Sequence, residues 1–208
     1  MDKAVKSVAV PRWPATAEPV TTLANAVTLV RTVVAVALGV AAIAQGSLEL
    51  VGIGYAVYWV GDIADGAVAR LRGEETRHGA VFDILSDRAC TSILAAGYLS
   101  IRPESAPALA VFLLQFMVLD CLLSLSFLHW EILGPNDFHA VDPVVYKLNW
   151  SPPAKALNTA AVIILLLAHL VWVAAALALV VAAVKAWSGR RVLRLLAERT
   201  PAELATVV

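Results

Sequence analysis

The chain has 208 residues, of which 60% are hydrophobic and only 15% charged, and its acidic and basic residues balance to a formal net charge of zero. A soluble domain of this size carries far more charge, so the composition excludes an ordinary soluble protein. We expect an integral membrane protein, and we expect no nucleic-acid partner. Cys90 and Cys121 both fall in apolar stretches, which predicts free, buried thiols.

Residues 1–20 are polar and contain several prolines, so they do not resemble a signal peptide. We expect a juxtamembrane segment that lies along the membrane surface. Trp13 fits an interfacial anchor, although a disordered lead-in explains it equally well.

Apolar stretches of helical length follow at residues 25–44, 48–70, 79–101 and 106–127. Each has about 20 residues, which is the length of helix that crosses the hydrocarbon core of a bilayer. The breaks between them contain Gly46, Gly73 and the pair Arg102 and Pro103. The pattern therefore predicts four membrane-spanning helices in this part of the chain.

Residues 156–186 are almost free of polar residues and contain no glycine or proline. A single helix of this length would span about 45 Å, which exceeds the hydrocarbon core, so we predict two short spans with a tight turn near His169. Basic residues flank the segment and place both of its ends in the cytoplasm: Lys155, Lys185, Arg190, Arg191 and Arg194.

The predicted fold class is therefore an all-α integral membrane protein with six transmembrane helices, both termini inside and a polar cavity that faces the cytoplasm. Residues 21–188 would form the membrane domain of this multi-pass protein of the cell membrane, and residues 189–208 a cytoplasmic tail. The loop at 129–155 contains Trp130, Tyr146 and Trp150, and we expect it to lie at the membrane interface.

Four carboxylates interrupt this apolar chain at Asp62, Asp65, Asp83 and Asp87. In helices, the first two lie three residues apart on one face, and the last two lie four apart on one face. A hairpin that turns around residues 72–78 would bring both pairs together, and their mutual repulsion then requires divalent cations. The alternative is that the aspartates pair only with arginines, namely Arg70, Arg72 or Arg88.

The spacing of these residues resembles, without a departure, the signature of the CDP-alcohol phosphotransferase family of membrane enzymes that make phospholipids. It comprises Asp62-x2-Asp65-Gly66-x2-Ala69-Arg70, then eight residues, then Gly79-x3-Asp83-x3-Asp87. The run Asn25-x2-Thr28-x2-Arg31 resembles the nucleotide-side element of this family. The resemblance covers residues 21–100, whereas the later helices match only in number and hydropathy.

The resemblance implies that an acceptor hydroxyl attacks the phosphorus next to the diacylglycerol of CDP-diacylglycerol and that CMP leaves. Two ions, Mg²⁺ or Mn²⁺, would neutralise the pyrophosphate. The four aspartates, Asp62, Asp65, Asp83 and Asp87, would be the metal ligands. Asp87 would also be the catalytic base. A nearby cation makes its carboxylate a weak base, but the same cation makes the acceptor hydroxyl more acidic.

Further residues of the signature are candidates for binding the donor. Gly66 lets the nucleotide approach the helix backbone, and Arg70 can bind a phosphate with its fork of donors. Each residue also has an alternative role. Gly66 and Gly79 can serve helix packing, Arg70 can extend to the lipid headgroups, and Thr76 can be a solvated loop residue. Arg31 either faces the pocket or pairs with an aspartate. The predicted substrate-binding residues are Asn25, Thr28, Arg31, Gly66, Arg70, Thr76 and Gly79.

The acceptor alcohol stays open among glycerol 3-phosphate, inositol 1-phosphate, serine and a second lipid such as phosphatidylglycerol, which would give cardiolipin. Arg88, Lys147 and Lys155 can bind an acceptor phosphate and favour glycerol 3-phosphate, although the positive-inside bias explains the two lysines equally well. Asp120 is expected to pair with a basic group or with Ser124. Membrane lipids are further partners, and a homodimer is left open.

A cation or proton carrier is a function of a different class that also places carboxylates in a membrane. A carrier needs its site near the bilayer midplane, whereas the aspartates are expected at the cytoplasmic ends of their helices. A carrier function also leaves Gly66, Ala69 and Arg70 without a role. The histidines His129, His139 and His169 lack the spacing of metal ligands and are expected in loops or turns.

Overall fold

The computed structural model describes residues 18–198, and every regular element among them is helical. The chain is therefore an all-helical protein over this range, as the sequence predicts. The expectations for Trp13 and for the end of the C-terminal tail lie outside the described residues.

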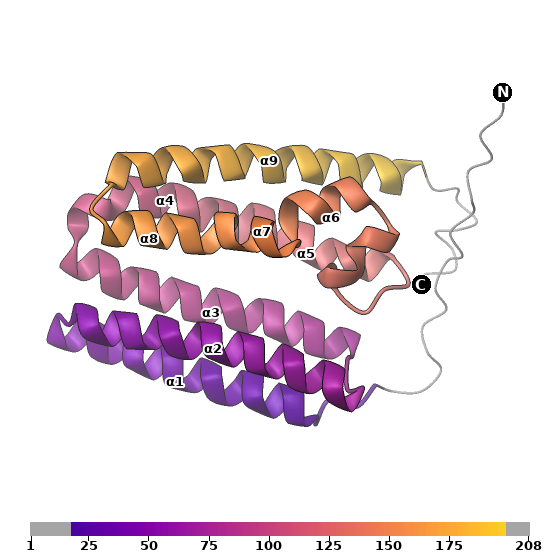
Figure 1. Ribbon diagram of the computed structural model, residues 1–208, viewed down its shortest axis with the longest axis horizontal. Helices are drawn as coiled ribbons and strands as arrows, with labels where there is room; N and C mark the ends of the chain where they lie inside the picture. The colour runs from indigo at the N-terminus through magenta and orange to yellow at the C-terminus, as the bar shows by residue number, and fades with distance from the viewer. Residues whose placement is uncertain (1–17, 199–208) are drawn as a thin grey trace.

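The first half of the protein consists of three long helices joined by short turns (Figure 1). They are α1 (Leu23–Gln45), α2 (Leu48–Arg72) and α3 (Arg77–Ile101). Both intervening breaks contain a glycine in the left-handed region, Gly46 at φ 63° and Gly73 at φ 62°, which end α1 and α2. Both predicted breaks, and the hairpin around residues 72–78, are confirmed.

The second half begins with an interrupted helical run that reverses into two further runs. The first run comprises η1 (Pro103–Ser105), α4 (Ala106–Leu114), η2 (Gln115–Asp120), α5 (Cys121–Leu125) and η3 (Ser126–His129). After η4 (Pro135–Ala140) and α6 (Pro143–Asn149), the second run comprises α7 (Pro152–Lys155), η5 (Ala156–Ala160) and α8 (Ala161–Leu167). The last run is α9 (Val171–Ala197).

The reversal between α8 and α9 lies at His169, which has a positive φ of 58°. Non-glycine residues take this left-handed conformation uncommonly. Only three residues separate the end of α8 at Leu167 from the start of α9 at Val171, so the predicted turn near His169 is confirmed. α1 begins and α9 ends at the same end of the helical bundle (Figure 1).

Four helical runs of the described chain are long and apolar enough to cross a membrane. They are Leu23–Gln45, Pro103–His129, Pro143–Leu167 and Val171–Ala197. The chain is therefore a helical membrane protein. α2 and α3 have 25 residues each but are more polar, because they carry the aspartates and several arginines. Six crossings remain a prediction.

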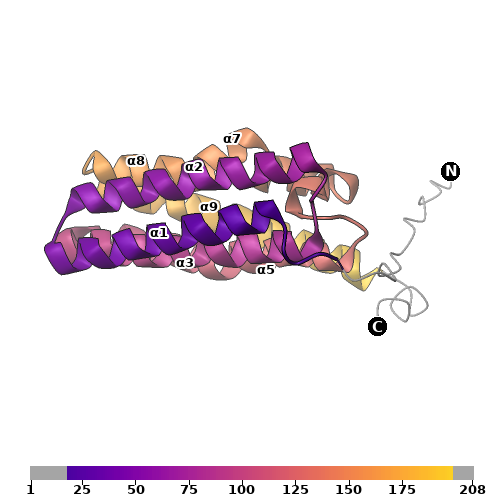
Figure 2. The same cartoon turned by 90° about the horizontal axis from the view of Figure 1, so that it is seen from below.

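The helices pack in two groups. α1 packs along both α2 and α3, whereas α9 packs along α4 and α8. Figure 2 shows the bundle from below, with α1 and α2 in front of the second group, and α3 contacts α4 and α5. A core that includes Leu94, Phe112 and Val162 joins the two groups.

A second core fixes the segment between α5 and α7. It packs Phe127, Trp130, Phe138 and Trp150 against one another, and the Phe138 and Trp150 ring centroids lie 4.9 Å apart. Trp130 and Trp150 were expected at the membrane interface, but both are buried in this cluster. The aromatic rings hold the segment against the bundle, because burial inside the protein removes more of their surface from water than an interface would.

Candidate active site

The α2–α3 hairpin brings carboxylates from both helices to one place. One oxygen each from Asp62, Asp83 and Asp87 lies within 4.8 Å of the others, a grouping that can hold a metal ion. Carboxylate oxygens are the ligands that Mg²⁺ and Mn²⁺ prefer in proteins. The predicted meeting of the two pairs is thus confirmed for three of the aspartates.

Asp65 differs from the other aspartates because its side chain is buried behind them. Its Oδ2 accepts hydrogen bonds from Thr28 Oγ1 and Arg31 Nε, each at 2.7 Å. Asp65 thereby joins α2 to α1, in addition to any part it takes in binding a cation.

Arg31 lies at the centre of the aspartate cluster. Its guanidinium pairs with Asp65, with Asp83, with Asp87 at 3.1 Å and with Asp62 at 3.5 Å. The residue is only 3% exposed and does not line the cavity described below. Of the two roles left open for Arg31, the structure supports pairing with the aspartates. One guanidinium against four carboxylates leaves an excess of negative charge for cations to balance.

Two of the three arginines that the sequence offered as alternative partners pair with other carboxylates. Arg72 pairs with Glu74 at 2.5 Å, and Arg88 pairs with Asp120. Arg70 lines the cavity beside Gly66. Pairing of the aspartates with Arg72 or Arg88 was therefore the wrong alternative, because each of these arginines pairs with a different carboxylate.

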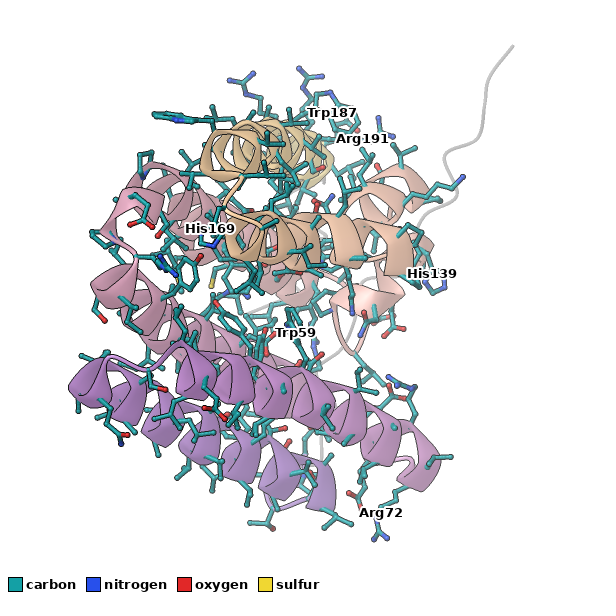
Figure 3. The ribbon with its side chains drawn as sticks, turned by 60° about the vertical axis from the view of Figure 1, so that its left-hand side comes forward. Trp59, Arg72, His139, His169, Trp187 and Arg191 are labelled. Atoms are coloured by element: carbon teal, nitrogen blue, oxygen red, sulfur yellow. The ribbon has the colours of Figure 1, made fainter. Side chains whose placement is uncertain are left out.

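A cavity of about 520 Å³ opens beside the cluster, and one wall comes from the first three helices. Six of the seven predicted substrate-binding residues line it: Asn25, Thr28, Gly66, Arg70, Thr76 and Gly79. The aspartates line the same wall. Trp59, which also lines the cavity, lies between the two helix groups (Figure 3).

The opposite wall comes from the second half of the chain. Its lining includes Phe116, Asp120, Ser124, Asn149 and Lys185. Asp120 accepts from Arg88 through one oxygen and from Lys185 Nζ, at 2.5 Å, through the other. The expectation that Asp120 pairs with a basic group is confirmed.

The predicted acceptor-binding residues divide between the cavity and the surface. Arg88 lines the cavity, with its guanidinium carbon 3.8 Å from the centroid of the Phe116 ring. Lys155 also lines it and donates to Asn136 Oδ1 at 2.9 Å. Lys147 is exposed on α6, outside the cavity. The turn of α6 points Lys147 away, so the structure does not bring it to the site.

Sequence reasoning missed two residues of the site. Lys185 was interpreted only as a determinant of topology, although a lysine within an apolar helix is itself a sign of a buried functional group. Gly61 was not singled out. A Cβ added to Gly61 would lie 2.5 Å from Arg31 Cβ, so only glycine lets α1 and α2 approach closely enough to place Arg31.

A carboxylate cluster that can hold a metal ion, on the wall of a cavity in a helical membrane protein, is typical of membrane-embedded enzymes that act on phosphate-containing substrates. A family model described as CDP-alcohol phosphatidyltransferase matches residues 21–187. The chain belongs to the CDP-alcohol phosphatidyltransferase family, and it is therefore a transferase of phospholipid biosynthesis. Comparisons with curated proteins and with solved structures give no match.

Proposed function

We propose that this protein transfers the phosphatidyl group of CDP-diacylglycerol to glycerol 3-phosphate, which gives phosphatidylglycerol phosphate and CMP. The observation that carries this proposal is the meeting of Asp62, Asp83 and Asp87 within 4.8 Å on a wall of a cavity whose other wall carries Lys185. The site faces the cytoplasm of the cell membrane in this proposal, since the soluble acceptor arrives from there.

The wall formed by α1, α2 and α3 would bind the cytidine diphosphate. A Cβ added to Gly79 would lie 3.0 Å from both Asn25 Oδ1 and Thr76 Oγ1, so the absence of a side chain keeps these polar groups close together. At Gly66 an added Cβ would meet only the flexible end of Arg70, at 3.2 Å. The space above Gly66 is thus open to a ligand, and Arg70 can donate to a phosphate there.

Asp62, Asp83 and Asp87 would hold two divalent cations, Mg²⁺ or Mn²⁺, with Asp65 as a further ligand behind them. When bound, such cations neutralise the pyrophosphate and stabilise the charge that develops on the transferred phosphorus. Arg31 keeps the carboxylates in place through its ion pairs with all four.

Asp87 would accept the proton of the acceptor hydroxyl as the oxygen attacks phosphorus and the bond to the CMP phosphate breaks. Its position supports this role, because the next residue, Arg88, reaches the opposite wall and pairs with Asp120. A hydroxyl held at that wall would lie beside Asp87.

The charges of the opposite wall favour an acceptor that carries a phosphate. Arg88, which reaches this wall from α3, and Lys185 share the carboxylate of Asp120. Lys155 and Asp137 also line the cavity here, so these charged residues leave one net positive charge. Inositol 1-phosphate satisfies the same charge, whereas serine and phosphatidylglycerol lack a phosphomonoester. These three compounds are the alternative acceptors for the same phosphatidyl transfer. Membrane lipids and a second copy of the chain are further proposed partners.

An acceptor screen tests the proposal. Purified protein with Mn²⁺ and CDP-diacylglycerol is offered each acceptor, and CMP and labelled lipid are measured. We expect turnover with glycerol 3-phosphate and an increase of about tenfold in its KM in Lys185→Met, because one charged hydrogen bond is lost. Turnover with serine alone would contradict the assignment of the acceptor. If no acceptor led to CMP release, the result would contradict the proposed reaction and favour the alternative of a cation or proton carrier.

A further inference from the structure

The N-termini of α1 and α3 lie side by side at the mouth of the cavity, and each has a local cap. Thr22 Oγ1 accepts from the amide of Asn25 at 3.0 Å, and Thr76 Oγ1 accepts from the amide of Gly79 at 2.9 Å. Neither helix has an acidic residue in its first turn. The amides that precede the capped ones, and the positive end of each helix dipole, therefore need other partners.

Those partners come crosswise from the segment that leads into the other helix. Glu74, just before α3, accepts from the amides of Leu23 and Ala24 in α1 at 3.0 and 3.5 Å. Glu18, just before α1, accepts from the amides of Arg77 and His78 in α3 at 2.9 and 3.2 Å. We call Glu18 and Glu74 the crossed caps.

Both side chains are held by more than the backbone amides. Glu18 Oε2 also lies 3.2 Å from His78 Nδ1, and Glu74 Oε1 accepts from Arg72 Nε at 2.5 Å. The hydrogen bond from Arg72, with those from the Ala24 and Leu23 amides, lowers the pKa of Glu74, so this carboxylate stays ionised at neutral pH. An ionised carboxylate makes the stronger cap.

The crossed caps fix the starts of α1 and α3, which carry residues of the cavity wall proposed to bind the cytidine diphosphate. Asn25 lies in the first turn of α1, and Thr76 and Gly79 lie at the start of α3. Asn25 Oδ1 is within 3.0 Å of the place where Gly79 would carry a Cβ, so the two helix starts are in close contact. A shift of either start would change the spacing of the polar groups around the nucleotide.

We propose that Glu18 and Glu74 are positioning residues for the donor: they lock the starts of α1 and α3 together and so set the width of the nucleotide side of the cavity. The proposal rests on the function proposed above, and it concerns the affinity for CDP-diacylglycerol and not the acceptor or the chemical step. Neither glutamate belongs to the family signature, and each holds the helix starts through the amides and side chains that it binds.

The test compares Glu18→Ala and Glu74→Ala with the conservative Glu18→Gln and Glu74→Gln, in which an amide oxygen can still accept. Glu49→Ala is the matched control, since Glu49 is an exposed acid in the first turn of α2, at the other end of that helix from the hairpin. KM for each substrate, kcat and hydrogen exchange of the capped amides are measured. Exchange reports on the caps even in a variant with poor activity.

We expect Glu74→Ala to speed exchange at Leu23 and Ala24, and Glu18→Ala to speed exchange at Arg77 and His78. Each should raise KM for CDP-diacylglycerol about tenfold, with KM for the acceptor and kcat within about twofold of wild type, and glutamine should restore most of the loss. Faster exchange with an unchanged KM for the donor would overturn the proposal. So would an equal rise in both KM values. Wild-type protein that releases no CMP would instead refute the proposed function.

Discussion

Asp87 shares the carboxylate cluster with Asp62 and Asp83 on one wall of the cavity, while its neighbour Arg88 pairs across the cavity with Asp120. We predict that Asp87→Asn lowers kcat about 10³-fold, as expected for loss of a general base, and keeps measurable binding of CDP-diacylglycerol. Three carboxylates remain to bind cations in this variant.

The comparison for Asp87→Asn is Asp62→Asn, which we expect to lose both turnover and donor binding. Equilibrium binding and single-turnover release of CMP separate the two effects. A near-normal rate in Asp87→Asn would mean that another group, such as the acceptor's own phosphate, takes the proton.

Gly61 offers a second test at the residue scale, because its role is purely steric. An added Cβ would lie 2.5 Å from Arg31 Cβ and 2.6 Å from Arg31 Cδ, so Gly61→Ala must push α1 away from α2. We expect kcat to fall about 10²-fold, the usual effect of misplacing a catalytic group by about 1 Å.

Gly52→Ala is the matched control on the same helix, since nothing lies within 4 Å of its added Cβ. It should keep full activity and gain slightly in thermal stability, because alanine has the higher helix propensity. Equal activity of Gly61→Ala and Gly52→Ala would mean that Arg31 is not needed to hold the aspartates.

At the scale of elements, the hairpin of α2 and α3 is the unit that creates the carboxylate cluster. Each helix alone presents two aspartates, and Gly73, in the left-handed conformation, lets the chain turn so that the two faces meet. Close carboxylates are stable together only if their charge is balanced, and Arg31 balances part of it.

We therefore predict that activity needs Mg²⁺ or Mn²⁺ and disappears on chelation. Ca²⁺ should support less than about one tenth of the rate, because its larger and looser coordination shell misplaces the pyrophosphate for in-line attack. CMP release is measured in excess chelator and after each ion is added back. Full turnover in excess chelator would contradict a role for cations at the hairpin.

At the scale of the whole molecule, the α2–α3 hairpin, α6 and the end of α9 lie at one end of the bundle, and the turn at His169 lies at the other (Figures 1 and 3). If all six long helical runs cross the membrane, these two ends face opposite sides. The turn at His169 supports this topology, since α8 and α9 reverse direction there.

We predict that a cysteine placed at Lys147, which is exposed on α6, reacts with a membrane-impermeant reagent only from the cytoplasmic side. A cysteine at His169 should react only from the opposite side. Labelling in intact cells and in inverted vesicles of a variant free of Cys90 and Cys121 measures both. Cytoplasmic labelling at His169 would show that α8 and α9 do not both cross.

Much of the helical framework could be predicted from sequence because it depends on local features. For α1, α2 and α3, the apolar stretches gave helix bounds within a few residues, whereas α9 continues beyond the predicted stretch to Ala197. Gly46, Gly73 and the region of His169 marked where the chain turns. The spacing of the aspartates indicated which faces of α2 and α3 carry charge, since helical periodicity alone places residues three and four apart together.

The partners of the charged groups could not be predicted in this way, because they depend on how each helix is rotated against helices far away in the chain. Arg31 meets Asp65 across 34 positions, and Lys185 meets Asp120 across 65. Exclusion of Lys147 from the cavity has the same origin, since the orientation of α6 is set by aromatic packing around Phe138 and Trp150. Sequence by itself determined the class, the turns and the acidic motif, whose signals are periodic and local. Only the tertiary structure decided which basic residue pairs with the aspartates and which residues face them across the cavity, because these contacts depend on the packing of both halves of the chain.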